Sequence, residues 1–279
     1  MPRFADSRSP KPEQVAEHYS SGYEAGRLAA GTSQLERERT RDLLARFLPP
    51  PPAIILDVGG GPGGHALWLA QRGYRVHLFD ITPLHVELAR AASAAQPDAP
   101  LASAQVGDAC SLPWPAETSD AVLLFGPLYH LTDARDRLSA LGEAYRVLKP
   151  GGLVFAVGIS RFASLLDGLD SGYLEDSRFA EIVKEDLKTG QHRNPTSQPE
   201  YFMDTFFHHP DELRAEVAAA GFEVRGIYGI EGPCWVASRF EAWWNDRTLR
   251  ELLLQIARAV EREPSLLGAS PHLLAVGRK

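Results

Sequence analysis

Eight residues between positions 57 and 64 have the composition of a ligand-binding turn. The segment reads DVGGGPGG and begins with the last two residues of the apolar run AIILDV, so it lies between an expected buried strand and an expected helix. Glycines here let the backbone turn sharply and let a ligand approach the main chain closely. The helix that follows points its N–H groups and the positive end of its dipole at that ligand. The turn therefore predicts a cofactor site.

The spacing of glycines and acids in this region allows two kinds of cofactor. The glycines satisfy G-x-G-x-x-G, the dinucleotide pattern, and Asp80 ends the next apolar segment about 20 residues on, where an acid would bind ribose hydroxyls. The run from Asp57 to Gly63 also satisfies D-x-G-x-G-x-G. An acid two residues before the first glycine suits a ligand with a cationic amino group better than a pyrophosphate.

Seven short apolar segments alternate with segments of helical periodicity after residue 53. The expected strands are 53–58, 74–81, 103–109, 120–126, 153–159, 222–230 and 272–279, with a turn expected at 149–152. Such alternation is typical of βαβ units. The sequence therefore predicts an α/β fold with a doubly wound, mainly parallel, seven-stranded sheet. In this fold the ligand crevice lies at the carboxyl ends of the strands, where the glycine turn and Asp80 are expected.

Three segments do not follow this alternation. We expect residues 1–50 to form an N-terminal helical arm and residues 51–279 to form the main domain. Insertions at about 160–208 and 233–268 follow the fifth and sixth strands, so we expect helical lids that form a substrate cap. Ten of the 25 aromatic residues lie between positions 201 and 244, which predicts the wall of a dry pocket.

Four features in order resemble the class I S-adenosylmethionine (SAM) dependent methyltransferases. They are DVGGGPGG after the first strand, the acid in HLFDIT, the segment GDACSLPW and the run EAYRVLKPGGLVFAV. A dehydrogenase has no reason to carry the last two. The resemblance covers roughly residues 50–160, and 208–230 more weakly. It implies a Rossmann-like methyltransferase fold, with SAM as cofactor and S-adenosylhomocysteine as product.

The resemblance assigns ten positions to the cofactor. The residues expected along the methionine part of SAM are Asp57, Gly59, Gly61, Gly63, Phe125 and Gly126. Those expected at the ribose and adenine are Asp80, Ile81, Asp108 and Ala109. Asp80 would accept hydrogen bonds from both ribose hydroxyls, and Asp57 would lie near the amino group. Turns and helix caps are the alternative role for the three acids.

The reacting groups are expected just after the fourth strand. The enzyme must hold a nucleophile in line with the C–S bond of SAM and exclude water. Tyr129 is expected to orient the substrate and His130 to act as general base, with simple packing as the alternative. In the N-terminal arm, Tyr19, Tyr23 and Arg27 recur at nearly helical spacing. The resemblance implies a helix that closes over SAM, and a solvated helix is the alternative.

The amino-acid composition favours a small-molecule partner over nucleic acid, a membrane or a metal. The net charge of -7 disfavours nucleic acid, and the longest apolar runs, of about five residues, fall far below the roughly 18 of a membrane span. Cys110 and Cys234 are too few for a disulfide framework or a cysteine zinc site, so we expect no metal and a reduced, cytoplasmic setting. A small-molecule substrate fits best. The sequence does not determine whether the chain forms a homo-oligomer, nor where Glu231 and His272 face.

The main hypothesis is a bacterial SAM-dependent methyltransferase that acts on a small metabolite. It would move the methyl group to an oxygen or nitrogen atom by in-line displacement, with carbon less favoured. The first alternative reuses the fold for cyclisation or elimination, because a fold does not fix a reaction. A nicotinamide oxidoreductase and a non-catalytic partner subunit are two further alternatives.

Overall fold

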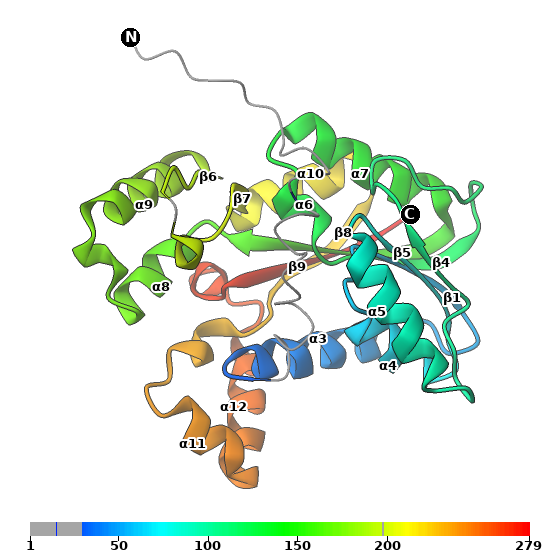
Figure 1. The fold of residues 1–279 in the computed structure, drawn as a ribbon, viewed down its shortest axis with the longest axis horizontal. Helices are drawn as coiled ribbons and strands as arrows, with labels where there is room; N and C mark the ends of the chain where they lie inside the picture. The colour runs from blue at the N-terminus through cyan, green and yellow to red at the C-terminus, as the bar shows by residue number, and fades with distance from the viewer. Residues whose placement is uncertain (1–14, 16–29, 197) are drawn as a thin grey trace.

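Nine strands form one mixed sheet in the computed structural model, which describes residue 15 and residues 30–196 and 198–279 (Figure 1). Seven of them follow the predicted order: β1 Ile54–Val58, β2 Arg75–Asp80, β3 Ser103–Val106, β4 Ser119–Leu124, β5 Leu148–Ser160, β8 Glu223–Gly229 and β9 His272–Arg278. In space they lie β3-β2-β1-β4-β5-β9-β8. β9 runs antiparallel to both of its neighbours, and the other pairs among these seven are parallel. The predicted doubly wound, mainly parallel α/β fold is confirmed.

Two further strands were not predicted. β6 (Gln191–His192) and β7 (Thr205–His208) pair antiparallel within the first insertion. They exist because β5 runs past the end of β4, which pairs with it only as far as Ala156. The backbone of Ile159 and Ser160 then pairs with β7, in parallel. The short helix α6 (Pro127–His130), which follows β4, packs against β7.

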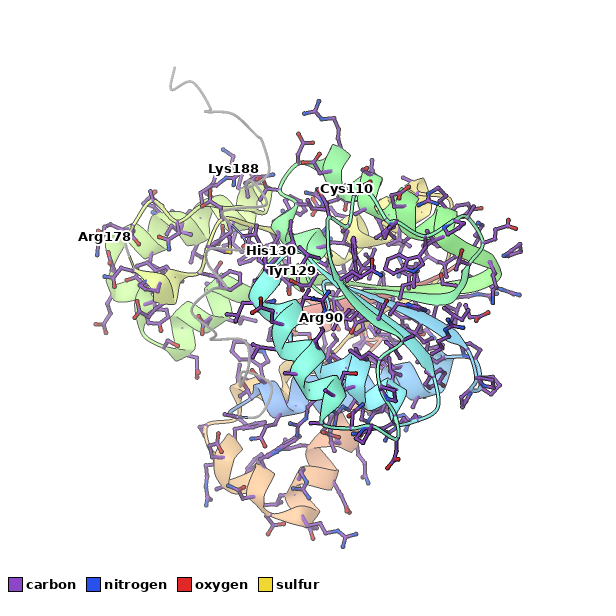
Figure 2. All side chains as sticks on the ribbon, turned by 45° about the vertical axis from the view of Figure 1, so that its right-hand side comes forward. Arg90, Cys110, Tyr129, His130, Arg178 and Lys188 are labelled. Atoms are coloured by element: carbon purple, nitrogen blue, oxygen red, sulfur yellow. The ribbon has the colours of Figure 1, made fainter. Side chains whose placement is uncertain are left out.

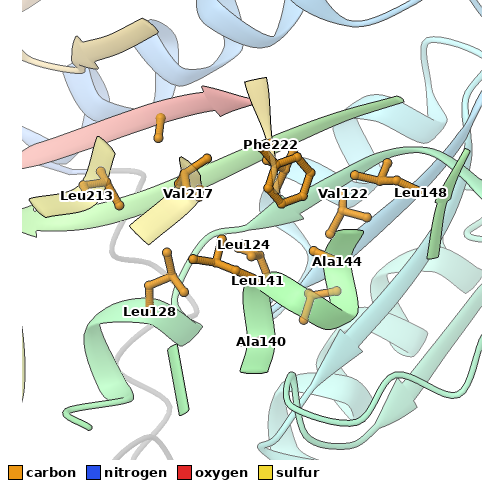
Figure 3. Close-up of a cluster of buried hydrophobic side chains, with 14 of the residues drawn as sticks. Val122, Leu124, Leu128, Ala140, Leu141, Ala144, Leu148, Leu213, Val217 and Phe222 are labelled. Carbon is orange, nitrogen blue, oxygen red and sulfur yellow. The ribbon is translucent and has the colours of Figure 1, made fainter. Parts of the chain in front are cut away.

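Helices cover both faces of the sheet. Apolar side chains of α3 (Ser33–Phe47), α4 (Gly64–Ala70) and α5 (Pro83–Ala94) pack on one face. Those of α7 (Ala134–Val147) and α10 (Pro210–Ala219) pack on the other, where Figure 3 shows them against β4. None of the helices in the described ranges is long and apolar enough to cross a membrane.

Prolines and glycines set most element boundaries as the sequence predicts. α3 ends before the proline run at 49–52, and Pro83 opens α5. The prediction of a turn at 149–152 is wrong, because β5 already begins at Leu148. The N–H of Gly151 donates to the Lys279 carbonyl at 2.8 Å, so pairing with the end of the chain makes this segment an irregular start of β5.

Each insertion packs around a small hydrophobic cluster of its own. The first holds α8 (Ala163–Asp170) and α9 (Ser177–Thr189), on the left in Figure 1. The second holds α11 (Phe240–Asn245) and α12 (Arg247–Val260), at the bottom, and it packs on the first turn of α3.

The aromatic residues between 201 and 244 are divided among four clusters. Tyr201 lies in the first insertion and Trp244 in the second. Phe222 and Tyr228 pack on opposite faces of the sheet. These aromatic side chains therefore help to build separate cores, and the pocket wall stays a prediction.

Candidate functional site

The glycine turn joins β1 to α4 through backbone conformations that glycine adopts readily. Gly59, Gly61 and Gly63 have φ angles of +76°, +55° and +93°. The N–H of Gly59 donates to the Phe79 carbonyl of β2 at 2.7 Å, which ties the turn to the neighbouring strand. Within the described ranges, a Cβ on Gly61 would meet no heavy atom within 4 Å. The turn therefore offers open main chain to a ligand, as its sequence predicts.

The carboxyl group of Asp57 is buried beneath this turn. Asp57 is 1% exposed, and neither oxygen has a donor at good hydrogen-bond geometry within the described ranges. A Cβ on Gly60 would lie 2.9 Å from the Asp57 Cγ, so glycine is required above it. Burial, together with the charge of Asp80, raises the pKa of Asp57 to about 7, against the smaller opposing effect of the Ala66 N–H. A buried carboxyl group with no donor at good geometry in the described part of the chain fits the cationic amino group of SAM.

The carboxylate of Asp80, at the end of β2, already has three hydrogen-bonding groups of the protein beside it. Its Oδ2 accepts the Gly61 N–H at 2.8 Å, and its Oδ1 accepts the Thr82 N–H at 2.8 Å. His85 Nδ1 lies 3.2 Å from the same Oδ1. A carboxylate has about four acceptor positions, so one remains on Oδ2. Asp80 can accept one ribose hydroxyl as it stands, and the predicted pair of bonds requires one present contact to give way.

The residues predicted at the adenine follow β2 and β3. The Gly107 N–H donates to the Asp80 carbonyl at 3.0 Å, which holds the ends of these strands together. One oxygen of Asp108 accepts a backbone N–H two residues later at 2.8 Å and so closes a turn. Ala109 packs partly against the core, and Ile81 is half-buried. Their contact with adenine stays a prediction.

The end of β4 lies directly against the glycine turn. A Cβ on Gly126 would lie 3.5 Å from the Gly59 carbonyl oxygen and 3.7 Å from Tyr129 Oη. The rings of Tyr129 and His130 are 4.7 Å apart, and Figure 2 shows them side by side. Tyr129 and Phe125 are half-buried, while His130 is 9% exposed. The structure thus brings these predicted residues together. Their roles stay predictions.

The predicted N-terminal residues Tyr19, Tyr23 and Arg27 lie outside the residues that the structure describes. Their proposed contact with the SAM carboxylate therefore stays a prediction as well.

One network that sequence reasoning missed holds the chain just after His130. Arg137 of α7 donates to the Leu131 and Thr132 carbonyls at 2.9 and 3.0 Å, and to Glu216 of α10 at 2.7 Å. Burial raises the pKa of Glu216, but hydrogen bonds from His208 and Arg137 outweigh it and bring the value to about 2. These residues come from three elements, so no sequence pattern announces the network.

Comparison with known proteins gives the family. A family model described as a methyltransferase domain matches residues 55–152. The demethylmenaquinone methyltransferase of Thermus thermophilus is 31% identical over 220 residues, with 71% of this chain and 86% of that protein covered. The chain belongs to the class I SAM-dependent methyltransferases. It is therefore an enzyme that uses SAM, which the turn at Gly61 and the buried carboxyl group of Asp57 also fit.

One further relative and one solved structure are also similar to this chain. A ubiquinone/menaquinone biosynthesis C-methyltransferase of Ruegeria is 28% identical, with 70% of this chain and 75% of that protein covered. Among solved structures, the [4+2]-cyclase SpnF has a TM-score of 0.63 at 18% identity, with 98% of both chains covered. At that identity the likeness shows the fold alone.

Proposed function

We propose that this methyltransferase moves the methyl group of SAM to a small molecule bound between the end of β4 and the two insertions. The convergence of Gly59, Gly126 and Tyr129 is the observation that supports this placement most directly. Bound along the glycine turn, SAM supplies an electrophilic methyl group. The protein has to align the acceptor and exclude water, which can lower the barrier by several kcal/mol, within the roughly 7–11 kcal/mol available to positioning.

The acceptor atom is an oxygen or nitrogen in this proposal, with an activated ring carbon as the second candidate. Carbon is added as a candidate because one relative is a ubiquinone/menaquinone biosynthesis C-methyltransferase and the other is a demethylmenaquinone methyltransferase. All three acceptors lose a proton during the reaction. In this proposal His130 takes that proton and Tyr129 orients the acceptor, and the position of both beside the end of β4 supports these roles.

The two insertions form the substrate cap of this proposal. β7 continues the sheet from β5 beyond the end of β4, so it brings the first insertion against α6. α11 and α12 pack on α3 below the same edge of the sheet (Figure 1). A cap in this position would exclude water from the reacting atoms.

Titration calorimetry of the full chain with SAM, S-adenosylhomocysteine and NADH is the first test. Binding of the two adenosyl ligands alone is expected. A panel of phenols, hydroquinones and primary amines is then incubated with SAM, and S-adenosylhomocysteine and methylated product are measured by mass spectrometry. Adenosyl binding without methyl transfer to any related metabolite would favour a reused fold, and NADH binding would contradict the cofactor.

A further inference from the structure

A cavity of about 390 Å³ lies among α3, α4 and α12 (Figure 1). Arginine side chains from all three regions line it, together with Trp68 of α4 and Leu254 of α12. None of the residues placed in the methyl-transfer site contributes to its wall. We propose that this cavity is a second ligand site, separate from the methyl-transfer site, and that it binds a phosphate monoester.

The cavity is built from residues that share one face of each helix. On α12, Leu254 and Arg258 are four positions apart, so their side chains lie on the same side of the helix. The same spacing separates Trp68 from Arg72, which follows the end of α4. Arg41 faces them from α3. Three segments far apart in the sequence therefore direct cationic groups into one space.

Two guanidinium groups lie against the same aromatic ring. The Cζ of Arg72 is 3.9 Å from the centroid of the Trp68 ring, and the Cζ of Arg41 is 5.2 Å from it. Arg72 donates to the Trp68 carbonyl at 3.3 Å and forms no ion pair with another described residue. Glu38 lies 3.5 Å from Arg41 but is closer, at 3.0 Å, to Arg37. Acids of the described chain thus match these two cations poorly.

Arg41 has an incomplete set of contacts. Its Nε is buried and has no acceptor among the described residues. Burial lowers the pKa of Arg41, the Glu38 carboxylate opposes this effect, and the charges of Arg37 and Arg72 lower the pKa further. Cations held together in this way repel each other. A bound anion would remove that repulsion and supply the missing acceptor.

The acids in the wall do not neutralise the cavity. Four arginines and two acids line it, although the whole chain has a net charge of -7. One of these acids, Asp42, is already paired with Arg39 and lies 3.6 Å from Arg258. The cavity is therefore a local positive region on an acidic protein, which favours an anionic ligand.

The shape and charge of the cavity favour a phosphate over a carboxylate. Guanidinium groups match the oxygens of either anion, but a phosphate monoester carries close to two negative charges near pH 8 and has three strong acceptor oxygens. The volume falls within the usual range for small-ligand pockets. Leu254 adds an apolar surface for the organic part of the ligand. These features describe a small monoester better than a bare ion.

The cavity is at the far end of α4 from the cofactor. The glycine turn leads into Gly64 at the start of this helix, and Arg72 is about 12 Å further along its axis. Arg72 also precedes β2, so it lies near the amino end of that strand. The cofactor residues lie at the carboxyl ends of the strands. A ligand in the cavity and SAM at the glycine turn can be bound together.

Titration calorimetry with phenyl phosphate at pH 8 tests the ligand class. The full chain is first saturated with S-adenosylhomocysteine, so that the glycine turn is occupied. One phenyl phosphate should bind per chain, ~10-fold or more tightly than benzoate, which carries a single charge. Equal affinity for the two probes would reject the phosphate, and phenyl phosphate binding that S-adenosylhomocysteine abolishes would show that the anion uses the cofactor site.

Three arginine variants test the place of binding. Arg41→Gln and Arg72→Gln should each weaken phenyl phosphate binding ~10-fold or more, while SAM affinity stays within about threefold. Arg247→Gln removes the same charge from an exposed side chain of α12, about 16 Å along the helix from Arg258, and should change neither affinity. An equal loss in all three variants would reduce the effect to the net charge of the protein. Thermal melts check that each variant is folded.

The indole ¹H–¹⁵N signal of Trp68 locates the ligand without any loss of an arginine. It is assigned with Trp68→Phe and followed during the phenyl phosphate titration, again with S-adenosylhomocysteine present. This signal should shift, with the same dissociation constant as calorimetry gives. An unmoved Trp68 signal at saturation would contradict the proposal.

Vesicles of phosphatidylcholine, with and without phosphatidic acid, distinguish the source of the monoester. Sedimentation with phosphatidic acid alone, lost in Arg72→Gln, would support the proposal and identify a lipid headgroup. Binding of phenyl phosphate without sedimentation would support it and identify a soluble ligand. If the chain binds neither probe, the proposal is wrong.

Discussion

Two buried carboxyl groups at the same edge of the sheet behave in opposite ways. Asp57, on the cofactor side, has no donor at good geometry within the described residues, and its pKa is raised to about 7. Glu231, on the proposed acceptor side, accepts three hydrogen bonds from Ser270 and His272. Among the described residues, Asp57 accepts no hydrogen bond of good geometry. Most acceptor positions of Glu231 are instead occupied by donors of the protein itself. The difference separates a group that awaits a ligand's charge from one that positions another residue.

The largest expected effect is the change in the free energy of unfolding when Asp57 is replaced by asparagine. Asp57→Asn should stabilise the ligand-free protein at pH 8 by up to roughly 4 kcal/mol, the energy of a shift from 3.8 to about 7. The raised pKa means that ionisation destabilises the fold progressively from about pH 4 to pH 7 and fully above. The gain should therefore grow across that range and then level off.

Urea denaturation at pH 5 and pH 8 measures this gain, with the half-buried Asp108→Asn as the matched control. Asp57→Asn should also bind SAM more weakly, as measured by calorimetry. A gain in stability that does not change with pH would show that the Asp57 carboxyl is not buried as a charge.

Glu231→Gln should have the opposite sign. The amide nitrogen cannot accept the hydrogen bonds that the carboxylate accepts, so donors from Ser270 and His272 lose their partner. We expect a loss of about 1–3 kcal/mol in the free energy of unfolding. Urea denaturation at pH 8 measures it beside Glu223→Gln, a change of an exposed acid at the start of β8. If Glu231→Gln is as stable as wild type, the carboxylate is not fixed as described.

Asp80→Ala should weaken SAM binding by roughly 1–3 kcal/mol, because ribose hydroxyls lose an acceptor. Calorimetry with SAM measures the change, and a thermal melt checks that loss of the Gly61 and Thr82 contacts leaves the protein folded. Unchanged affinity would mean that the three internal donors exclude Asp80 from the ribose.

Gly61→Ala tests whether the open side of the turn faces the ligand. Its φ of +55° makes alanine cost about 1 kcal/mol in stability, although no atom of the described residues is within 4 Å of the new Cβ. SAM affinity should fall by more than stability does. The comparison variant is Gly172→Ala, which has φ of +75° and an equally open Cβ position in the first insertion, outside the glycine turn. Equal effects of both variants on SAM affinity would remove Gly61 from the cofactor site.

The cofactor side was predictable because its parts are local. The glycine turn, the acid after β2 and the segment after β4 each follow a strand directly, and the carboxyl ends of parallel strands meet at one edge. Two details were not predictable from spacing. One is that the Gly61 N–H donates a hydrogen bond to the Asp80 carboxylate. The other is that β7 extends the sheet beside β5. Both depend on how far neighbouring strands extend.

By itself the sequence determined the α/β fold, the seven core strands and the positions of Asp57 and Asp80. Short-range hydrophobic periodicity and glycine spacing carry that information. Only the tertiary structure decided that Glu231 holds His272, that Arg137 fixes the chain after His130, and that the aromatic residues serve four separate cores. Those contacts join residues tens of positions apart, and their geometry arises only when the strands and helices pack.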